Sequence, residues 1–141
     1  MMIIIIIYKS LIDAHDFVIL TYSNTKIIRG GIINNEKEEY ILNNETIPLE
    51  IQLTNKKEPI YSREIDDPLE FKFLKNTFQK GSISMVKISK TKSSSTEFFI
   101  STQKSAVLEG RYSVFGKVIN GFEILENIES KDYILEIELN N

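Results

Sequence analysis

The chain has 141 residues, a net charge of −3 and 42% hydrophobic residues, which is the balance of a globular protein and not of a disordered chain. Its length suits one core, so we expect residues 1–141 to form a single domain. Lysine and arginine are scattered, which argues against direct nucleic-acid binding. Cysteine is absent, so disulfides and thiolate metal sites are excluded.

Several apolar runs predict strands in chain order. The first, Ile3–Ile7, is an uninterrupted β-branched run that is typical of a strand buried on both faces. It is too short for a membrane span and lacks the basic flank of a signal peptide, so we expect an intracellular protein, cytoplasmic or nuclear, with no membrane contact. The second run bends at Arg29-Gly30-Gly31. The predicted strands are Ile3–Ile7, Ile27–Ile33, Ser82–Ile88, Phe98–Ser101, Val114–Ile119 and Tyr133–Leu139.

Two short helices are predicted between the strands. Asp13–Leu20 begins with a capping residue and places Phe17 and Leu20 on one face. The second helix, Gly121–Ile128, repeats apolar residues at helical spacing. Many short strands with two helices indicate an all-β barrel or sandwich capped by helices.

Polar segments separate these elements. Asn34–Lys57 is predicted as an excursion that holds one or two edge strands, with Glu36–Glu39 as a solvated loop face or, less simply, a docking patch. Lys87–Ser95 is predicted as a flexible loop without core residues, in which Ser93–Ser95 form a mobile turn. His15 is the single histidine, so neither a catalytic triad nor a metal cluster can be assembled.

Three segments in the second half resemble a known family. Gly81–Met85, Glu97–Thr102 and Leu108–Val118 resemble, in the same order, the GxLSMA, SQFFIxT and LDGxHxVFGxV segments of the cyclophilin family. Gly121–Leu125 is similar to the short helix that follows them there, and Ile60–Ser62 and Glu70–Leu74 are similar to segments before them. The resemblance is strong over residues 58–128. It implies an all-β, closed antiparallel cyclophilin-like β-barrel capped by two short helices.

The N-terminal part departs from the family pattern. Asp16–Leu20 looks like the family's first helix, and Arg29-Gly30-Gly31 looks like its QGG segment. Between them the family has about two dozen residues, including the FHR segment with its catalytic arginine, whereas here only Thr21–Ile28 stand. We therefore expect an N-terminally reduced barrel that closes differently at one side or leaves an exposed edge.

The chemistry implied by the resemblance is prolyl cis-trans isomerisation. Rotation about a peptide C–N bond meets a barrier of about 18–20 kcal/mol because resonance is lost in the twisted state. Catalysis needs an apolar pocket for the proline ring and a fixed donor near the prolyl nitrogen. No cofactor and no metal ion are expected.

The resemblance assigns the pocket residues in part. Phe99 and Leu108 match pocket residues of the family, and Ile27, Val86 and Tyr112 replace its Met, Ala and His. Ordinary core packing explains each of these apolar residues equally well. Three further positions differ from the family pattern: Lys26 replaces a pocket Phe, Val107 replaces a Trp, and Ile88 stands at the entrance of a neighbouring pocket. With these changes we expect a narrower site that polarises the prolyl nitrogen less.

Arg29 and Glu97 stand where the family has two glutamines that face each other at the rim of the site. We hypothesise that they form an ion pair. Either the pair is purely structural, or Arg29 replaces the missing catalytic arginine from a shifted position.

Three functions follow from these assignments. The first is a domain that binds proline-containing peptide or protein, with weak or lost isomerase activity, as a subunit or adaptor in a larger assembly. The second is an active prolyl isomerase in which Arg29 or Lys26 supplies the charge. The third is a scaffold that contacts partners through Asn34–Lys57. Outside the family, an unassigned small β domain is the alternative.

Overall fold

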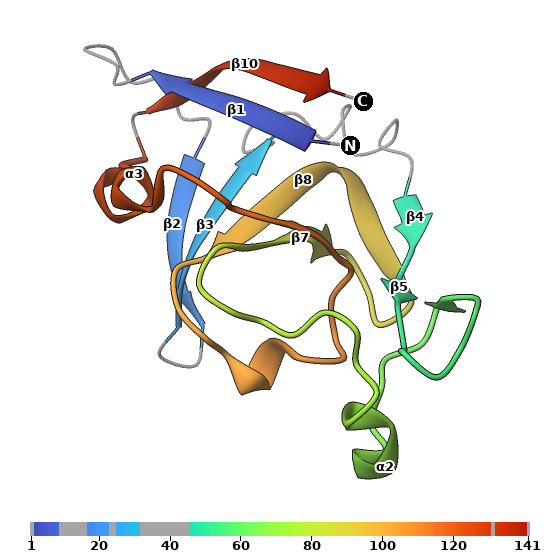
Figure 1. The fold of residues 1–141 in the computed structure, drawn as a ribbon. Coiled ribbons are helices and arrows are strands. Elements are labelled where there is room, and N and C mark those ends of the chain that lie inside the picture. Colours follow the sequence, from blue (N-terminus) through green and yellow to red (C-terminus); the bar gives the residue numbers. More distant parts are fainter. Residues whose placement is uncertain (1, 9–16, 23–24, 32–45, 131, 141) are drawn as a thin grey trace.

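The computed structural model describes residues 2–8, 17–22, 25–31, 46–130 and 132–140 (Figure 1). These residues form mostly strands, with two short α-helices and one 3-10 turn. The strands are β1 (Met2–Tyr8), β2 (Phe17–Tyr22), β3 (Thr25–Gly31), β4 (Thr46–Pro48), β5 (Glu50–Ile51), β6 (Ile60–Tyr61), β7 (Ser82–Lys87), β8 (Lys92–Ser101), β9 (Val114–Lys117) and β10 (Tyr133–Asn140). The helical elements are α2 (Pro68–Phe71), η1 (Ala106–Leu108) and α3 (Phe122–Asn127).

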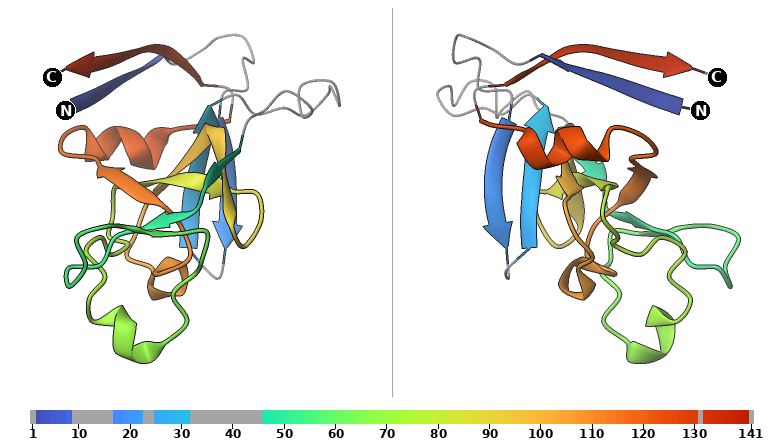
Figure 2. Two further views of the ribbon diagram at one scale, coloured as in Figure 1. Left: turned by 90° about the vertical axis from the view of Figure 1, so that its right-hand side faces the viewer. Right: turned by 60° about the vertical axis from the view of Figure 1, so that its left-hand side comes forward.

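The main sheet is antiparallel and runs in the order β2-β3-β8-β7-β9, with β4 also paired to β8. Within the described residues its path starts at β2 and ends at β9 without closing on itself, so the predicted closed barrel is not confirmed. The strands β1 and β10 pair with each other from Met2 opposite Asn140 to Tyr8 opposite Tyr133, with a register shift between Ile6 and Ile7. We call this pair the terminal ribbon; Figure 2 shows it crossing one end of the main sheet. Because its two strands are paired with each other, neither extends the main sheet toward closure.

The register of β3 against β8 gives the main sheet two different faces. Ile28 lies opposite Ile100, and the next residue, Arg29, lies opposite Phe99. Successive side chains of a strand point to opposite faces. One face therefore carries Ile28 and Ile100, which pack with Leu125 of α3 in a buried cluster. The other face carries Arg29 and Phe99 and is free to form a site.

The predicted helix at Asp13–Leu20 is wrong where the structure describes it. Phe17–Leu20 belong to β2, which pairs with β3 from Phe17 opposite Gly30 to Tyr22 opposite Thr25. Aromatic and β-branched residues dominate this segment and favour a strand, whereas Phe17 and Leu20 match helical spacing only by coincidence. Residues 13–16 lie outside the described part of the chain.

The predicted loop over Lys87–Ser95 is shorter than expected. Strand β8 already begins at Lys92, and Ser93 and Ser94 are buried in it, so the mobile turn predicted at Ser93–Ser95 is wrong. Pairing with β4, Thr46 opposite Ser94, removes these serines from solvent. The burial of small polar residues such as these cannot be predicted from local sequence when the strand that covers them comes from a distant segment.

The remaining predicted elements agree with the structure. The helix at Gly121–Ile128 appears as α3, and the strands predicted around Ile3, Ile27, Ser82, Val114 and Tyr133 appear as β1, β3, β7, β9 and β10. The edge strands predicted within Asn34–Lys57 appear as β4 and β5, and residues 34–45 lie outside the described part.

The segment from β5 to α2 has its own apolar cluster beside the main sheet. Leu49, Ile51, Leu53, Ile65 and Leu74 are buried together. Helix α2 starts where the Asp67 carboxylate accepts a hydrogen bond from the Leu69 amide at 2.9 Å, with Pro68 in the first turn, a combination that favours a helix start. This second cluster fixes the segment that carries Glu64.

Gly31 ends β3 with a φ of +103°, and a Cβ there would lie 2.2 Å from the Thr96 carbonyl oxygen. Gly31→Ala should therefore lower the free energy of unfolding by about 1–3 kcal/mol, through backbone strain and this collision. Urea denaturation of the purified protein measures it. Gly116→Ala is the matched control, because its Cβ would meet only Ile83 atoms at 3.8 Å. Equal stability of the two variants would contradict the prediction.

Candidate functional site

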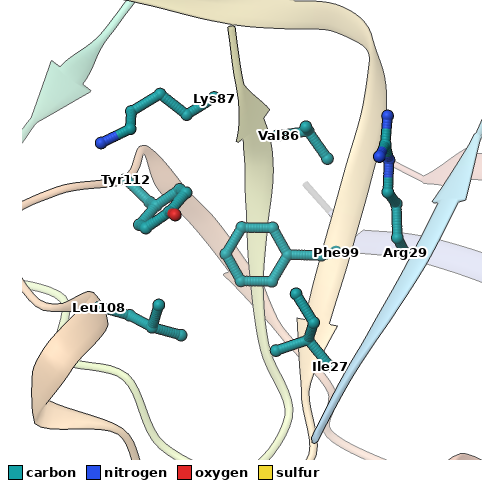
Figure 3. A pocket seen from close by; sticks show the side chains of 7 residues that line it. All are labelled: Ile27, Arg29, Val86, Lys87, Phe99, Leu108 and Tyr112. Atoms are coloured by element: carbon teal, nitrogen blue, oxygen red, sulfur yellow. The ribbon is translucent and has the colours of Figure 1, made fainter. Parts of the chain in front are cut away.

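Phe99 and Tyr112 line a pocket on the second face of the main sheet, and Phe78 packs against both of these rings. Phe78 and Phe99 stack at a centroid distance of 5.9 Å, and the Tyr112 ring meets Phe99 edge-on at 5.2 Å. Phe78, Phe99 and Leu108 are buried. The pocket has a volume of about 110 Å³ and is lined by Ile27, Arg29, Val86, Lys87, Phe99, Leu108 and Tyr112 (Figure 3). A dry cavity of roughly 150 Å³ holds a benzene molecule, so this pocket suits one small ring.

Strands β3 and β7 each supply two residues of the pocket lining. Ile27 and Arg29 are two residues apart on β3 and therefore share the face that carries Phe99. At the end of β7 the register with β8 shifts between Met85 and Lys87. A bulge of this kind redirects side chains, and here the consecutive residues Val86 and Lys87 both line the pocket.

Two further lining residues come from the segment that runs from η1 to β9. Leu108 closes η1, and a turn at Gly110, with a φ of +73°, leads to Tyr112. The Gly110 carbonyl accepts a hydrogen bond from the Ile65 amide at 2.8 Å. The Ser113 carbonyl accepts one from the Ser84 hydroxyl, also at 2.8 Å. These bonds hold Tyr112 between the second cluster and β7.

Arg29 and Glu97 form the ion pair that the sequence suggested. The Arg29 Nη2 atom donates to Glu97 Oε2 at 2.6 Å. The carboxylate is almost buried, with 9% of its side chain exposed, whereas 32% of the Arg29 side chain is exposed. The Arg29 Nε atom is buried and has no hydrogen-bond partner in the described part of the chain. The guanidinium is therefore anchored by Glu97 and borders the pocket.

A second ion pair stands on the other side of the pocket. The Lys87 ammonium donates to the Glu64 carboxylate and lies 4.9 Å from the centroid of the Tyr112 ring, within the range of a cation–π interaction. Sequence reasoning missed this pair. Glu64 belongs to a distant segment, and Lys87 was assigned to the end of a strand without a role. The available signal was only the position of Lys87 directly after the pocket residue Val86.

The structure brings most of the predicted site residues together. Ile27, Val86, Phe99, Leu108 and Tyr112 line one pocket with Arg29, and Glu97 holds Arg29 without lining the pocket itself. Phe78, which stacks under Phe99, was not predicted.

Lys26 and two apolar replacements do not belong to this pocket. Lys26 precedes Ile27 on β3 and is not among the lining residues; its charge acts on Glu126 of α3 instead, where it helps lower the pKa of that carboxyl, after the larger effects of Lys80. Lys26 is absent from the lining because successive side chains of β3 point to opposite faces of the sheet. Ile88 and Val107 are exposed hydrophobic residues outside the lining.

The described residues contain no group of three or more His, Cys, Asp or Glu side chains placed to hold a metal ion. The same part of the chain has no helix that is long and apolar enough to cross a membrane. His15 lies outside the described residues.

Comparison with known proteins agrees with the motifs and the pocket. The family model described as cyclophilin type peptidyl-prolyl cis-trans isomerase/CLD matches residues 15–138. The chain belongs to the cyclophilin family. A curated relative, peptidyl-prolyl cis-trans isomerase 10 of Caenorhabditis elegans, is 50% identical over 38 residues, which is 27% of this chain and 24% of that protein. Cyclophilin domains bind proline-containing peptides, and the small apolar pocket of this cyclophilin is consistent with that chemistry.

The Arg29–Glu97 pair in this cyclophilin should contribute to stability. Arg29→Gln should lower the free energy of unfolding by about 1–3 kcal/mol, because the nearly buried Glu97 carboxylate loses its partner. Glu97→Gln should lower it less, because the Arg29 side chain that loses its partner is more exposed. The double variant should lose less than the sum, since two amides can bond to each other. Urea denaturation of the three variants measures the coupling.

The control for this cycle is Arg63→Gln, which removes the exposed Arg63–Glu70 pair. An exposed pair contributes at most about 1 kcal/mol. Strictly additive losses at positions 29 and 97 would contradict a coupled pair.

Proposed function

We propose that this cyclophilin-type domain binds proline-containing segments of peptides or proteins in the pocket around Phe99, and that its isomerase activity is weak or lost. The observation that carries the proposal is a pocket for one ring whose bordering cations are each already bound to a carboxylate. Binding and catalysis make different demands on such a pocket.

Binding needs mainly apolar contact. A proline ring placed on Phe99 would meet Ile27, Val86, Leu108 and Tyr112, all in the pocket lining. Burial of apolar surface contributes roughly 25 cal/mol per Å², and the stacked Phe78 supports Phe99 from below. A preformed pocket requires little ordering on binding.

Catalysis needs a donor aimed at the prolyl nitrogen as the C–N bond twists. The Arg29 Nη2 atom is already bonded to Glu97, and its Nε atom is buried. A charge-assisted bond of this kind fixes the direction of the guanidinium, so the bond would have to move before a donor could be re-aimed at a prolyl nitrogen. Since a misplacement of about 1 Å can cost about a hundredfold in rate, the arrangement favours weak turnover.

An active isomerase is the second candidate, because Arg29 borders the pocket directly across from Phe99 on the paired strand. In that case Arg29 is the catalytic residue. A scaffold role through Asn34–Lys57, membership of a larger assembly and an intracellular location stay predictions.

Binding is tested by NMR titration of the isotope-labelled protein with the peptide Ala-Ala-Pro-Phe and with Ala-Ala-Ala-Phe. The proline peptide should shift the resonances of pocket residues, and the alanine peptide should bind at least about tenfold more weakly because it lacks the ring. Val86→Phe fills the pocket and should abolish the difference. Leu69→Phe on the exposed face of α2 is the control. Equal binding of both peptides would refute the proposal.

Turnover is tested by exchange spectroscopy on the same proline peptide, whose uncatalysed isomerisation takes about 10–100 s. We expect little acceleration at equimolar protein and no change with Arg29→Gln. Rapid exchange that disappears in Arg29→Gln, while the proline peptide still binds, would establish the second candidate instead.

A further inference from the structure

The charged groups that border the pocket are of one sign. Arg29 and Lys87 are its charged lining residues, and their partners Glu97 and Glu64 are not part of the lining. The exposed fractions of the side chains agree: 32% for Arg29 against 9% for Glu97, and 21% for Lys87 against 10% for Glu64. A ligand that enters the pocket therefore meets the cations, which are the more exposed members of both ion pairs.

The two cations flank the apolar base from different elements. Figure 3 shows Lys87 and Arg29 on opposite sides of the pocket, with Val86 and Phe99 between them. Lys87 comes from the bulged end of β7, and Arg29 comes from β3. In this view a ring on Phe99 would lie between the Lys87 and Arg29 side chains.

Both carboxylates are held by the fold, which orients the cations. The Glu97 amide donates to the Ser94 hydroxyl oxygen at 3.1 Å, and this fixes the backbone behind Arg29. Glu64 precedes Ile65, which is buried in the second cluster and bonded to Gly110. A guanidinium has five N–H donors and an ammonium has three, and within the described part of the chain each cation donates one hydrogen bond to a carboxylate.

We infer that the pocket selects prolyl segments that carry an acidic side chain, Asp or Glu, next to the proline. Lys87 and Arg29 are the specificity-determining residues, and Glu64 and Glu97 are positioning residues that present the two cations. The inference rests on the proposed binding of a proline ring at Phe99. A carboxylate beside the ring would meet the more exposed, pocket-lining member of each ion pair, so attraction exceeds repulsion.

The test measures dissociation constants for five matched six-residue peptides, each with one proline. Two peptides carry Glu or Gln directly before the proline, and two carry Glu or Gln directly after it. The fifth carries phosphoserine directly before the proline. The Glu peptide of at least one pair should bind about tenfold more tightly than its Gln partner. The difference should shrink as salt is raised, because the site is partly exposed.

Variants then assign the effect to the cations. Lys87→Met combined with Glu64→Gln, which leaves no unpaired buried carboxylate, should bring the ratio of Glu-peptide to Gln-peptide affinity on the Lys87 side to about one within that variant. Arg29→Gln with Glu97→Gln should do the same on the Arg29 side. Lys87→Arg should retain the preference. Lys90→Met, at an exposed position outside the lining, is the matched control and should change nothing.

The outcomes separate this inference from the proposed function. If Glu and Gln peptides bind equally, the acidic selectivity is refuted and proline binding stands. If no proline peptide binds, the proposed function falls and takes the selectivity with it. A preference for the phosphoserine peptide with none for either Glu peptide would overturn the assignment of a carboxylate ligand.

Discussion

The pairing of β3 with β8 is the constraint on which the site depends. This register places Arg29 opposite Phe99 and Ile28 opposite Ile100, so a single pair of strands faces both the core and the pocket. A shift of one residue would exchange the two faces, burying a guanidinium under α3 and exposing the aromatic base. The close approach at Gly31, next to Glu97, helps hold that register.

The two ion pairs at the pocket fix the orientation of the Arg29 and Lys87 side chains and limit their movement. The carboxylate bound to each cation fixes its direction and reduces the entropy lost when a ligand binds. The same carboxylate opposes any reorientation of the cation toward a prolyl nitrogen. A catalytic guanidinium must favour the twisted peptide bond over the planar one, whereas a selective binding site needs only a steady charge. The proposed binding role of this cyclophilin-type domain rests on this difference between the two tasks.

The sequence was informative where local pattern and long-range environment agree. The motifs around Gly81, Phe99 and Tyr112 identified the family and most of the pocket, and the paired exchange at 29 and 97 revealed an ion pair between distant segments. Prediction from sequence failed where contacts with distant segments decide the local structure. Phe17–Leu20 joined a strand because β3 was available to pair with it. Glu64 reached Lys87 because an unrelated apolar cluster carries it there. Neither partner can be inferred from spacing along the chain.

The terminal ribbon has a consequence for the order of folding. Its pairs, such as Met2 with Asn140, join the segments that lie farthest apart in the chain. Bringing such distant ends together costs more conformational entropy than forming a local hairpin, and contacts of this kind slow folding. The cost falls once the intervening strands are already assembled. We therefore expect the terminal ribbon to form late, after the main sheet has folded. Loss of the ribbon would leave the strands that carry the pocket with the contacts that they make among themselves.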